Sequence, residues 1–248
     1  MSKSMGGYRM VHFFGPDGAG KTTQVEKLAA HVEKQGVHVH KTWVRSPHTL
    51  AFVATLLLHR LGLHQRFYNP FGHMIVSRPR VDQNRVSRFL WVVLELVSVM
   101  PVVLREAVIP AVRGRALIAE RYLLDSIATI GFFVQEEGFV DSWAARLLYR
   151  LIPRDTLLVY LDADYPSILQ RRGEIAEPEE FIAFQRHVYG ILAERMRALV
   201  IYTPDHSIEE THAIICSALA AASAGAPLRS GAGARCERVA TPKTLKGR

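Results

Sequence analysis

Hydrophobic positions along the chain follow two patterns, short β-rich runs and longer stretches in which apolar residues recur at helical spacing. Near the N-terminus, Val11, Phe13 and Phe14 form a short run that ends at Gly15. In residues 20–35 the apolar positions then recur every three or four residues. This order predicts a strand, a glycine-containing loop and a helix.

The same two patterns continue through most of the chain. Four more strands are predicted, at residues 37–44, 116–119, 156–161 and 199–202. Helical patterns separate them, at residues 49–62, 86–107, 124–151, 165–172, 179–197 and 207–221. Strands that alternate with helices indicate an α/β fold. We therefore expect a five-stranded parallel sheet flanked by helices, with right-handed crossovers and ligands bound outside the carboxyl ends of the strands.

In residues 63–88 the hydrophobic positions recur with neither helical nor strand spacing. The segment combines Asn69-Pro70, Gly72 and Pro79 with four arginines, Arg78, Arg80, Arg85 and Arg88. We expect a long loop here, within an insertion that covers about residues 45–107. Loops of this length in a compact domain are usually functional or disordered.

Composition and charge separate a folded body from a tail. The 248 residues are 49% hydrophobic, which is enough for one buried core. Residues 225–248 contain six basic residues and the acidic Glu237, so +5 of the formal charge of +8 lies there. We expect one folded domain at residues 1–222 and a flexible basic tail at 223–248. Nonspecific, salt-sensitive binding of nucleic acid by the tail is the weakest functional alternative.

Other sequence features favour a cytoplasmic protein. The two cysteines, Cys216 and Cys236, show no metal-ligand spacing and no reason to pair, which fits a reducing compartment. Residues 1–9 lack the apolar core of a signal peptide. The longest apolar stretch, residues 89–104, is interrupted by Glu95 and is shorter than the roughly 20 residues of a bilayer span. We interpret it as a buried helix, with membrane contact as the lesser option.

One motif carries specific chemistry. Residues 15–22, Gly15-Pro16-Asp17-Gly18-Ala19-Gly20-Lys21-Thr22, satisfy G-x-x-x-x-G-K-[ST] between a predicted strand and a predicted helix, and Thr23 follows. Glycines let backbone N–H groups surround phosphate oxygens, and the helix adds its positive end. Lys21 then reaches the β- and γ-phosphates while the Thr22 hydroxyl is placed to ligate Mg²⁺. The motif predicts ATP and Mg²⁺ as cofactors.

The motif and its surroundings resemble the thymidylate kinase family of nucleoside-monophosphate kinases, which have a P-loop NTPase fold. The stretch F-F-G-P-D-G-A-G-K-T-T-Q is similar to the family's P-loop, and Glu120-Arg121-Tyr122 is similar to its Asp-Arg-Tyr element. Tyr160-Leu161-Asp162 and then Arg171-Arg172 resemble its fourth strand and its LID, at about residues 171–180. Further similarity is found at Phe184, Arg186, Tyr189 and residues 201–210. The likeness covers about residues 9–44 and 108–221.

The resemblance implies transfer of a phosphoryl group from ATP to a nucleoside monophosphate, dTMP in this family. Such transfer needs cations around the phosphoryl oxygens, and Lys21 and Mg²⁺ are two of them. The family supplies a further arginine from the P-loop or from the LID. Because the P-loop position is Ala19, the resemblance implies that Arg171 or Arg172 is catalytic. The alternative is that both belong to a solvated helix end.

Other residues receive roles from the same resemblance. Glu120 would hold a magnesium-bound water, or would simply pair with Arg121. Asp17 would accept a sugar hydroxyl of the acceptor, or would cap its own loop. Arg45 follows the second strand, where the family keeps an arginine for the acceptor phosphate. Arg121, as a further catalytic cation, and Tyr122 would also face the acceptor.

The middle of the chain departs from the family pattern. Residues 89–101 contain no clear match to the family's base-stacking aromatic or to its base-recognising arginine. Trp91 or Phe71 would stack on a base, or would be ordinary packing residues. The arginines of residues 78–88 would clamp an acceptor phosphate, or would be solvated. Two rival functions therefore stay open, a kinase for another phosphorylated acceptor and a nucleotide-binding regulatory protein. Partners would be small nucleotides and a second copy in a homodimer.

Overall fold

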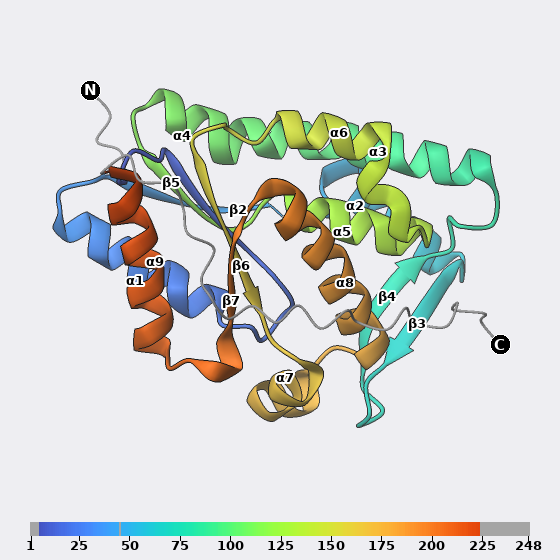
Figure 1. The fold of residues 1–248 in the computed structure, drawn as a ribbon. Helices are drawn as coiled ribbons and strands as arrows, with labels where there is room; N and C mark the ends of the chain where they lie inside the picture. The colour runs from blue at the N-terminus through green and yellow to red at the C-terminus, as the bar shows by residue number, and fades with distance from the viewer. Residues whose placement is uncertain (1–4, 45, 224–248) are drawn as a thin grey trace.

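A computed structural model describes residues 5–44 and 46–223 of the chain. Five parallel strands form one sheet in the order β2-β5-β1-β6-β7 (Figure 1). Their bounds are β1 Met10–Phe14, β2 Val39–Trp43, β5 Ala116–Arg121, β6 Thr156–Asp162 and β7 Leu199–Tyr202. The predicted α/β fold with a five-stranded parallel sheet is confirmed. Residues 224–248, nearly all of the predicted tail, lie outside the described residues.

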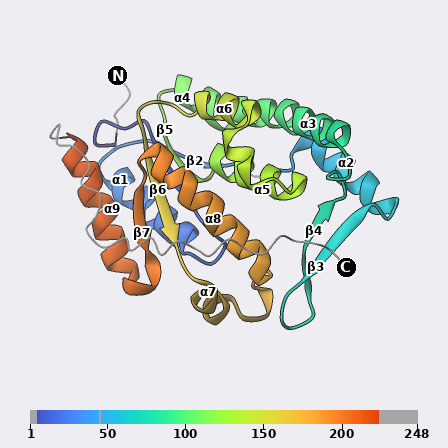
Figure 2. The same cartoon turned by 45° about the vertical axis from the view of Figure 1, so that its right-hand side comes forward.

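Helices cover both faces of this sheet, as Figure 2 shows from a second side. One face packs against α1 (Lys21–Lys34) and α9 (Ile208–Ser223), and the other against α3 (Arg85–Val103), α5 (Leu123–Val134) and α8 (Glu179–Met196). The other helices are α2 (Thr49–Arg60), α4 (Ile109–Val112), α6 (Trp143–Arg150) and α7 (Tyr165–Arg172). Successive strand residues point to opposite faces, so each strand contributes to two apolar cores.

Strand β1 shows this alternation. Val11 and Phe13 pack in the core beneath α1 and α9, whereas Met10 and Phe14 pack in the core with α3 and α5. All five residues of the strand are buried. This central parallel strand is therefore buried on both faces, and its polar residue is His12.

The prediction of a long loop at residues 63–88 is wrong. Strands β3 (His64–Tyr68) and β4 (Met74–Pro79) form an antiparallel hairpin there. The Asn69 side chain organises its turn, because Oδ1 accepts hydrogen bonds from the backbone N–H groups of Phe71 and His73 at 3.1 and 3.0 Å. Arg78 is buried within the hairpin, so a basic side chain occupies a position where an apolar one would have shown strand alternation.

The helical pattern at residues 124–151 divides into two helices. Helix α5 ends at Gln135, which adopts a left-handed conformation with φ of 54°. Helix α6 begins after Ser142, whose hydroxyl accepts a hydrogen bond from the Ala145 N–H at 3.1 Å. Both ends have ordinary capping chemistry, which the continuous apolar pattern concealed.

Strand ends position the candidate site. The P-loop follows β1, Glu120 and Arg121 end β5, Asp162 ends β6 and Thr203 follows β7. In a parallel sheet these ends meet at one edge, where ligands bind. Within the described residues, no helix is both long and apolar enough to cross a membrane.

Candidate active site

The P-loop has a backbone that requires glycine. Gly15, Gly18 and Gly20 have φ values of 142°, 95° and 92°, a region that other residues rarely adopt. A Cβ on Gly15 would lie 2.1 Å from the carbonyl oxygen of Leu161, so the loop packs directly on the end of β6. The sequence pattern therefore forms a tight turn whose N–H groups precede the first turn of α1, as phosphate binding demands.

Lys21 lies inside this loop. The side chain is 4% exposed, and its ammonium donates hydrogen bonds to the carbonyl oxygens of Gly15 and Pro16 at 2.8 and 2.7 Å. The ammonium also lies 3.3 Å from Asp17 Oδ1. These bonds hold a positive charge at the centre of the loop.

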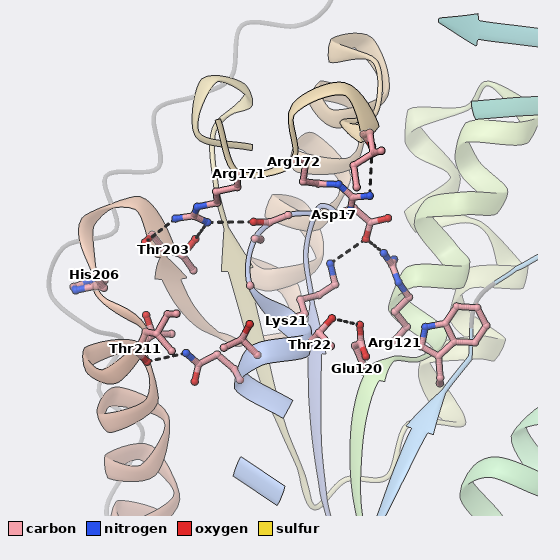
Figure 3. Close-up of a pocket in the computed structure, with 18 residues that line it drawn as sticks. Asp17, Lys21, Thr22, Glu120, Arg121, Arg171, Arg172, Thr203, His206 and Thr211 are labelled. Atoms are coloured by element: carbon pink, nitrogen blue, oxygen red, sulfur yellow. Dashed lines mark hydrogen bonds and ion pairs between the residues drawn. The ribbon is translucent and has the colours of Figure 1, made fainter. Parts of the chain in front are cut away.

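A cleft of about 790 Å³ opens over the P-loop. Figure 3 shows the side chains that converge on it from the ends of several strands. It is lined by Asp17, Gly18, Ala19, Gly20, Lys21, Thr22, Thr23, Gln24, Trp43, Glu120, Arg121, Arg171, Arg172, Ile175, Thr203, His206, Ile208 and Thr211. Eleven predicted site residues, from the P-loop, β5 and the LID, thus share one cleft.

Thr22 and Glu120 form a pair of oxygen donors in the cleft. The Thr22 hydroxyl donates a hydrogen bond to Glu120 Oε1 at 2.6 Å, across 98 residues of sequence. Hydroxyl and carboxylate oxygens are ligands that suit Mg²⁺, which prefers hard donors and keeps several waters. Glu120 therefore fits the magnesium role; the alternative ion pair with Arg121 does not form in the structure, since Arg121 contacts two other carboxylates.

Those carboxylates are Asp17 and Asp125. The Arg121 guanidinium contacts Asp17 and donates a hydrogen bond to Asp125 Oδ1 at 3.1 Å. Arg121 is 4% exposed, so this ion pair network is largely shielded from water. The Asp17 carboxylate lies between the cations of Lys21 and Arg121 (Figure 3). The network fixes both side chains at the border of the cleft.

Asp125 anchors the network from below. It accepts hydrogen bonds from the Tyr122 backbone N–H at 3.2 Å and from the Tyr189 hydroxyl at 3.1 Å. Burial opposes ionisation of this carboxyl, but the hydrogen bond with His12 and the charge of Arg121 outweigh it and lower the pKa of Asp125. A buried anion at this position orients the Arg121 guanidinium toward the cleft.

The two LID arginines are held differently. Arg171 donates to the Gly18 carbonyl at 3.2 Å, to the Thr203 hydroxyl at 2.9 Å and to the Thr203 carbonyl at 3.2 Å. Arg172 lies over the P-loop, and a Cβ on Gly18 would be 2.9 Å from its Cδ. Its Nη2 makes one long bond, 3.4 Å, to the Ile175 carbonyl, and its Nε has no hydrogen-bond partner in the described part of the chain.

Some predicted site residues lie elsewhere. Tyr122 is 1% exposed and packs edge-on against His12, and burial raises its pKa to about 12. Arg45 is outside the described residues. Trp91 is buried and packs near Phe133 in the apolar core. It is therefore an ordinary packing residue, the second of the two roles expected from the sequence.

The arginines predicted as a phosphate clamp have structural contacts. Arg78 donates to Gln65 Oε1 at 2.6 Å and to the Phe133 carbonyl at 3.3 Å. Arg88 donates twice to the Asp82 carbonyl, at 3.0 and 3.1 Å. Arg78 therefore fastens the hairpin to α5, and Arg88 ties the first turn of α3 to the segment that follows the hairpin.

Three residues that the sequence argument missed lie at or near the cleft. Thr203 follows β7 and binds Arg171, so the rule that ligand sites lie beyond strand ends would have found it. His206 lines the same side of the cleft. Asn69 donates to the carbonyls of Glu174 and Ala176, the second at 3.3 Å, and so joins the hairpin to the LID. Nothing in the local sequence signals that contact, which spans more than 100 residues.

Together, the parallel sheet, the glycine loop with its buried lysine and the adjacent hydroxyl–carboxylate pair define a protein with the P-loop NTPase fold. No protein-family model matches the chain. It is similar to a probable thymidylate kinase of Pyrococcus abyssi (strain GE5 / Orsay), 27% identical over 215 residues, which cover 84% of this chain and 93% of the relative. Thymidylate kinases of Bifidobacterium longum strains DJO10A and NCC 2705 are each 31% identical over 175 residues, 67% of this chain and 72% of the relative. The chain belongs to the thymidylate kinase family, and its predicted membership is confirmed.

Proposed function

We propose that the protein transfers the γ-phosphoryl group of ATP to dTMP, giving dTDP and ADP. The observation that carries the proposal is the meeting of Lys21, the Thr22–Glu120 pair and the two LID arginines in one cleft. Its family membership supports a kinase that acts on a nucleoside monophosphate. We also propose a cytoplasmic location, because Cys216 is a free thiol.

The chemistry assigned to these residues is positioning and charge stabilisation. Backbone N–H groups of the P-loop and the Lys21 ammonium would hold the β- and γ-phosphates. Thr22 and Glu120 would hold Mg²⁺, which when bound neutralises phosphate charge. We assign Arg172 to the transferred phosphoryl group, because its guanidinium lies over the loop with an unsatisfied Nε–H in the described chain. Arg171 would tether the LID instead.

The acceptor side would be formed by Asp17 and Arg121. The guanidinium of Arg121 is oriented by two carboxylates and faces the cleft, where it would meet the acceptor phosphate. Asp17 would accept a hydrogen bond from a sugar hydroxyl of the acceptor. Arg45, the other proposed phosphate contact, lies outside the described residues.

A kinase for a different nucleoside monophosphate is the second candidate. On α3, where the resemblance places base recognition, the fully buried ionisable group is Glu95 and not an arginine. Burial raises the pKa of Glu95 to about 8, so the carboxyl is largely neutral at pH 7. In neither protonation state does a carboxyl supply the positive charge that an arginine would offer to a thymine carbonyl. This difference favours testing other bases beside thymine.

A coupled ADP-release assay tests the proposal. ADP formation would be followed with ATP and Mg²⁺ alone and with dTMP, dUMP, dCMP, dGMP or AMP, using Lys21→Met as the inactive control. We expect acceptor-dependent release that is fastest with dTMP. Fastest release with another monophosphate would support the second candidate. Release that no acceptor stimulates would leave a nucleotide-binding regulatory protein as the better description.

We also propose a homodimer that forms through α2 and α3. Helix α2 packs on α3, since the Thr49 hydroxyl donates to the Ser98 carbonyl at 3.0 Å. Nine large apolar side chains on these helices are about half exposed or more: Leu50, Phe52, Val53, Leu56, Leu57, Val86, Phe89, Leu90 and Val97. An exposed apolar surface of this kind suits a protein interface, which typically takes roughly 800 Å² from each partner.

Sedimentation of the parent and of a variant tests the dimer. Leu57→Glu places a charge in the exposed apolar surface and should convert a dimer to a monomer with unchanged secondary structure. A parent that sediments as a monomer at micromolar concentration would exclude this interface.

A further inference from the structure

Helices α1 and α9 are joined by a series of polar contacts on successive turns. The Gln24 amide donates to the Ile208 carbonyl at 2.9 Å, and Lys27 pairs with Glu209 at 3.0 Å. Both helices advance in the same direction along this series, and both views show them side by side (Figures 1 and 2). The next turn of α1 carries His31.

His31 meets His212 and Cys216 of α9 at this next step. One ligand atom from each of the three side chains lies within 4.8 Å of the other two. Cys216 Sγ and His212 Nε2 are 3.4 Å apart, and the rings of His31 and His212 have centroids 5.7 Å apart. His212 Nδ1 is buried and has no hydrogen-bond partner among the residues described. The cluster therefore has two imidazoles and one thiol, and the His212 nitrogen that lies beside the thiol is Nε2.

This donor set suits a borderline-soft divalent metal. Zinc binds thiolate at about 2.3 Å and imidazole at about 2.0–2.1 Å with tetrahedral angles, so two such ligands lie about 3.5 Å apart. The distance between Cys216 and His212 matches that value. His31 is exposed, so its ring can turn toward the pair. A hydrogen bond from the Cys216 thiol is the alternative explanation of the short distance to His212, and His31 Nε2 lies 3.0 Å from the Gln35 amide nitrogen, a contact that zinc binding through Nε2 would replace.

We propose that His31, His212 and Cys216 bind one Zn²⁺ ion that joins α1 to α9, with solvent in the fourth coordination position. The site is distinct from the oxygen donors of the cleft, because nitrogen and sulfur ligands select Zn²⁺ over Mg²⁺. It lies on the same two helices whose first turns line the cleft with Gln24, Ile208 and Thr211. Bound zinc would thus fix the positions of α1 and α9, which line the cleft, without taking part in phosphoryl transfer.

Zinc titration of the full chain tests the site. The protein would carry no histidine tag and would be stripped with a chelator, and zinc would be added in the presence of excess Mg²⁺. We expect one zinc per chain by dye competition. At zinc about a hundredfold above Kd, the melting temperature should rise by about 5–10 °C.

Matched variants identify the ligands. Cys216→Ser and His212→Ala should lose the shift, and His31→Gln should weaken it. The controls are Cys236→Ser, which removes the other cysteine, and His38→Gln, which removes another exposed histidine of the same region; both should keep the full shift. Circular dichroism of the metal-free variants shows whether each one folds.

Cobalt supplies a readout that does not depend on stability. Co²⁺ should give a thiolate-to-metal charge-transfer band and the visible absorption of a tetrahedral ion, both absent in Cys216→Ser and both present in Cys236→Ser. The proposal is overturned if the parent shows neither binding nor the band. Equal zinc binding by Cys216→Ser and the parent would also overturn it, and loss in Cys236→Ser would assign the metal to that cysteine instead.

Discussion

Replacing Arg172 by alanine should slow turnover far more than it destabilises the protein. In the resting structure this side chain makes one long hydrogen bond, 3.4 Å to Ile175, and its Nε has no partner within the described residues. Removing it should cost less than about 0.5 kcal/mol of folding free energy, since surface changes of this kind are small. An arginine that stabilises the transferred phosphoryl group contributes about 10³- to 10⁵-fold to turnover, or about 4–7 kcal/mol of barrier.

Arg171→Ala is the matched comparison one residue away. This side chain makes three hydrogen bonds of 2.9–3.2 Å to Gly18 and Thr203, each of which contributes about 1 kcal/mol before solvent exposure reduces it. We expect its loss to lower the melting temperature by about 3–6 °C and to raise the KM for ATP, with a smaller fall in kcat.

Steady-state kinetics at saturating ATP and acceptor, with thermal melting of each variant, separate the two roles. Arg172→Ala with kcat within about tenfold of the parent, equivalent to about 1.4 kcal/mol, would refute the assignment of Arg172. A large fall in kcat for Arg171→Ala alone would transfer the catalytic role to Arg171. If the double variant also stays within tenfold, the cation must come from another residue such as Arg121.

Four further outcomes are expected. Lys21→Met should lower turnover by at least about 10³-fold in the ADP-release assay, while circular dichroism shows a folded chain. Asn69→Asp keeps the Oδ1 acceptor of the hairpin turn but loses the two bonds to LID carbonyls, so kinetics should show a severalfold higher KM for ATP with an intact hairpin. Burial raises the pKa of Glu95 from 4.5 to about 8. Between these two pH values the folded protein keeps a proton that the unfolded chain releases, so the free energy of unfolding falls as the pH rises from 4.5 to about 8. Glu95→Gln should remove up to about 5 kcal/mol of that fall, measured by denaturant unfolding at about pH 5 and pH 9. Deletion of residues 225–248 should leave turnover and melting nearly unchanged.

The fold could be predicted because each element of the core is indicated by a short, continuous segment of the sequence. Three signals follow one another within 26 residues: the apolar run of β1, the G-x-x-x-x-G-K-[ST] loop and the amphipathic pattern of α1. The central strands are buried on both faces, so their sequences are mostly apolar. For the same reason the sheet's carboxyl edge, and with it most of the cleft, could be located in advance.

The remaining features depend on contacts that no local pattern records. The β3–β4 hairpin carries the buried Arg78 at a strand position, so its alternation is hidden. Asn69 reaches the LID across more than 100 residues, and His31 meets Cys216 across 185 residues of sequence. Spacing along the chain could not show the proposed metal-ligand set, because two helices bring its members together only after folding.

Transfer of labelled γ-phosphate is the most direct test of the proposed activity. The parent would be incubated with ATP labelled at that phosphate, Mg²⁺ and dTMP, and the products would be separated by chromatography. We predict that label appears in dTDP, one mole for each mole of ADP, and that Lys21→Met gives neither product. Label that appears as inorganic phosphate, or that enters a different monophosphate faster than dTMP, would contradict a dTMP kinase.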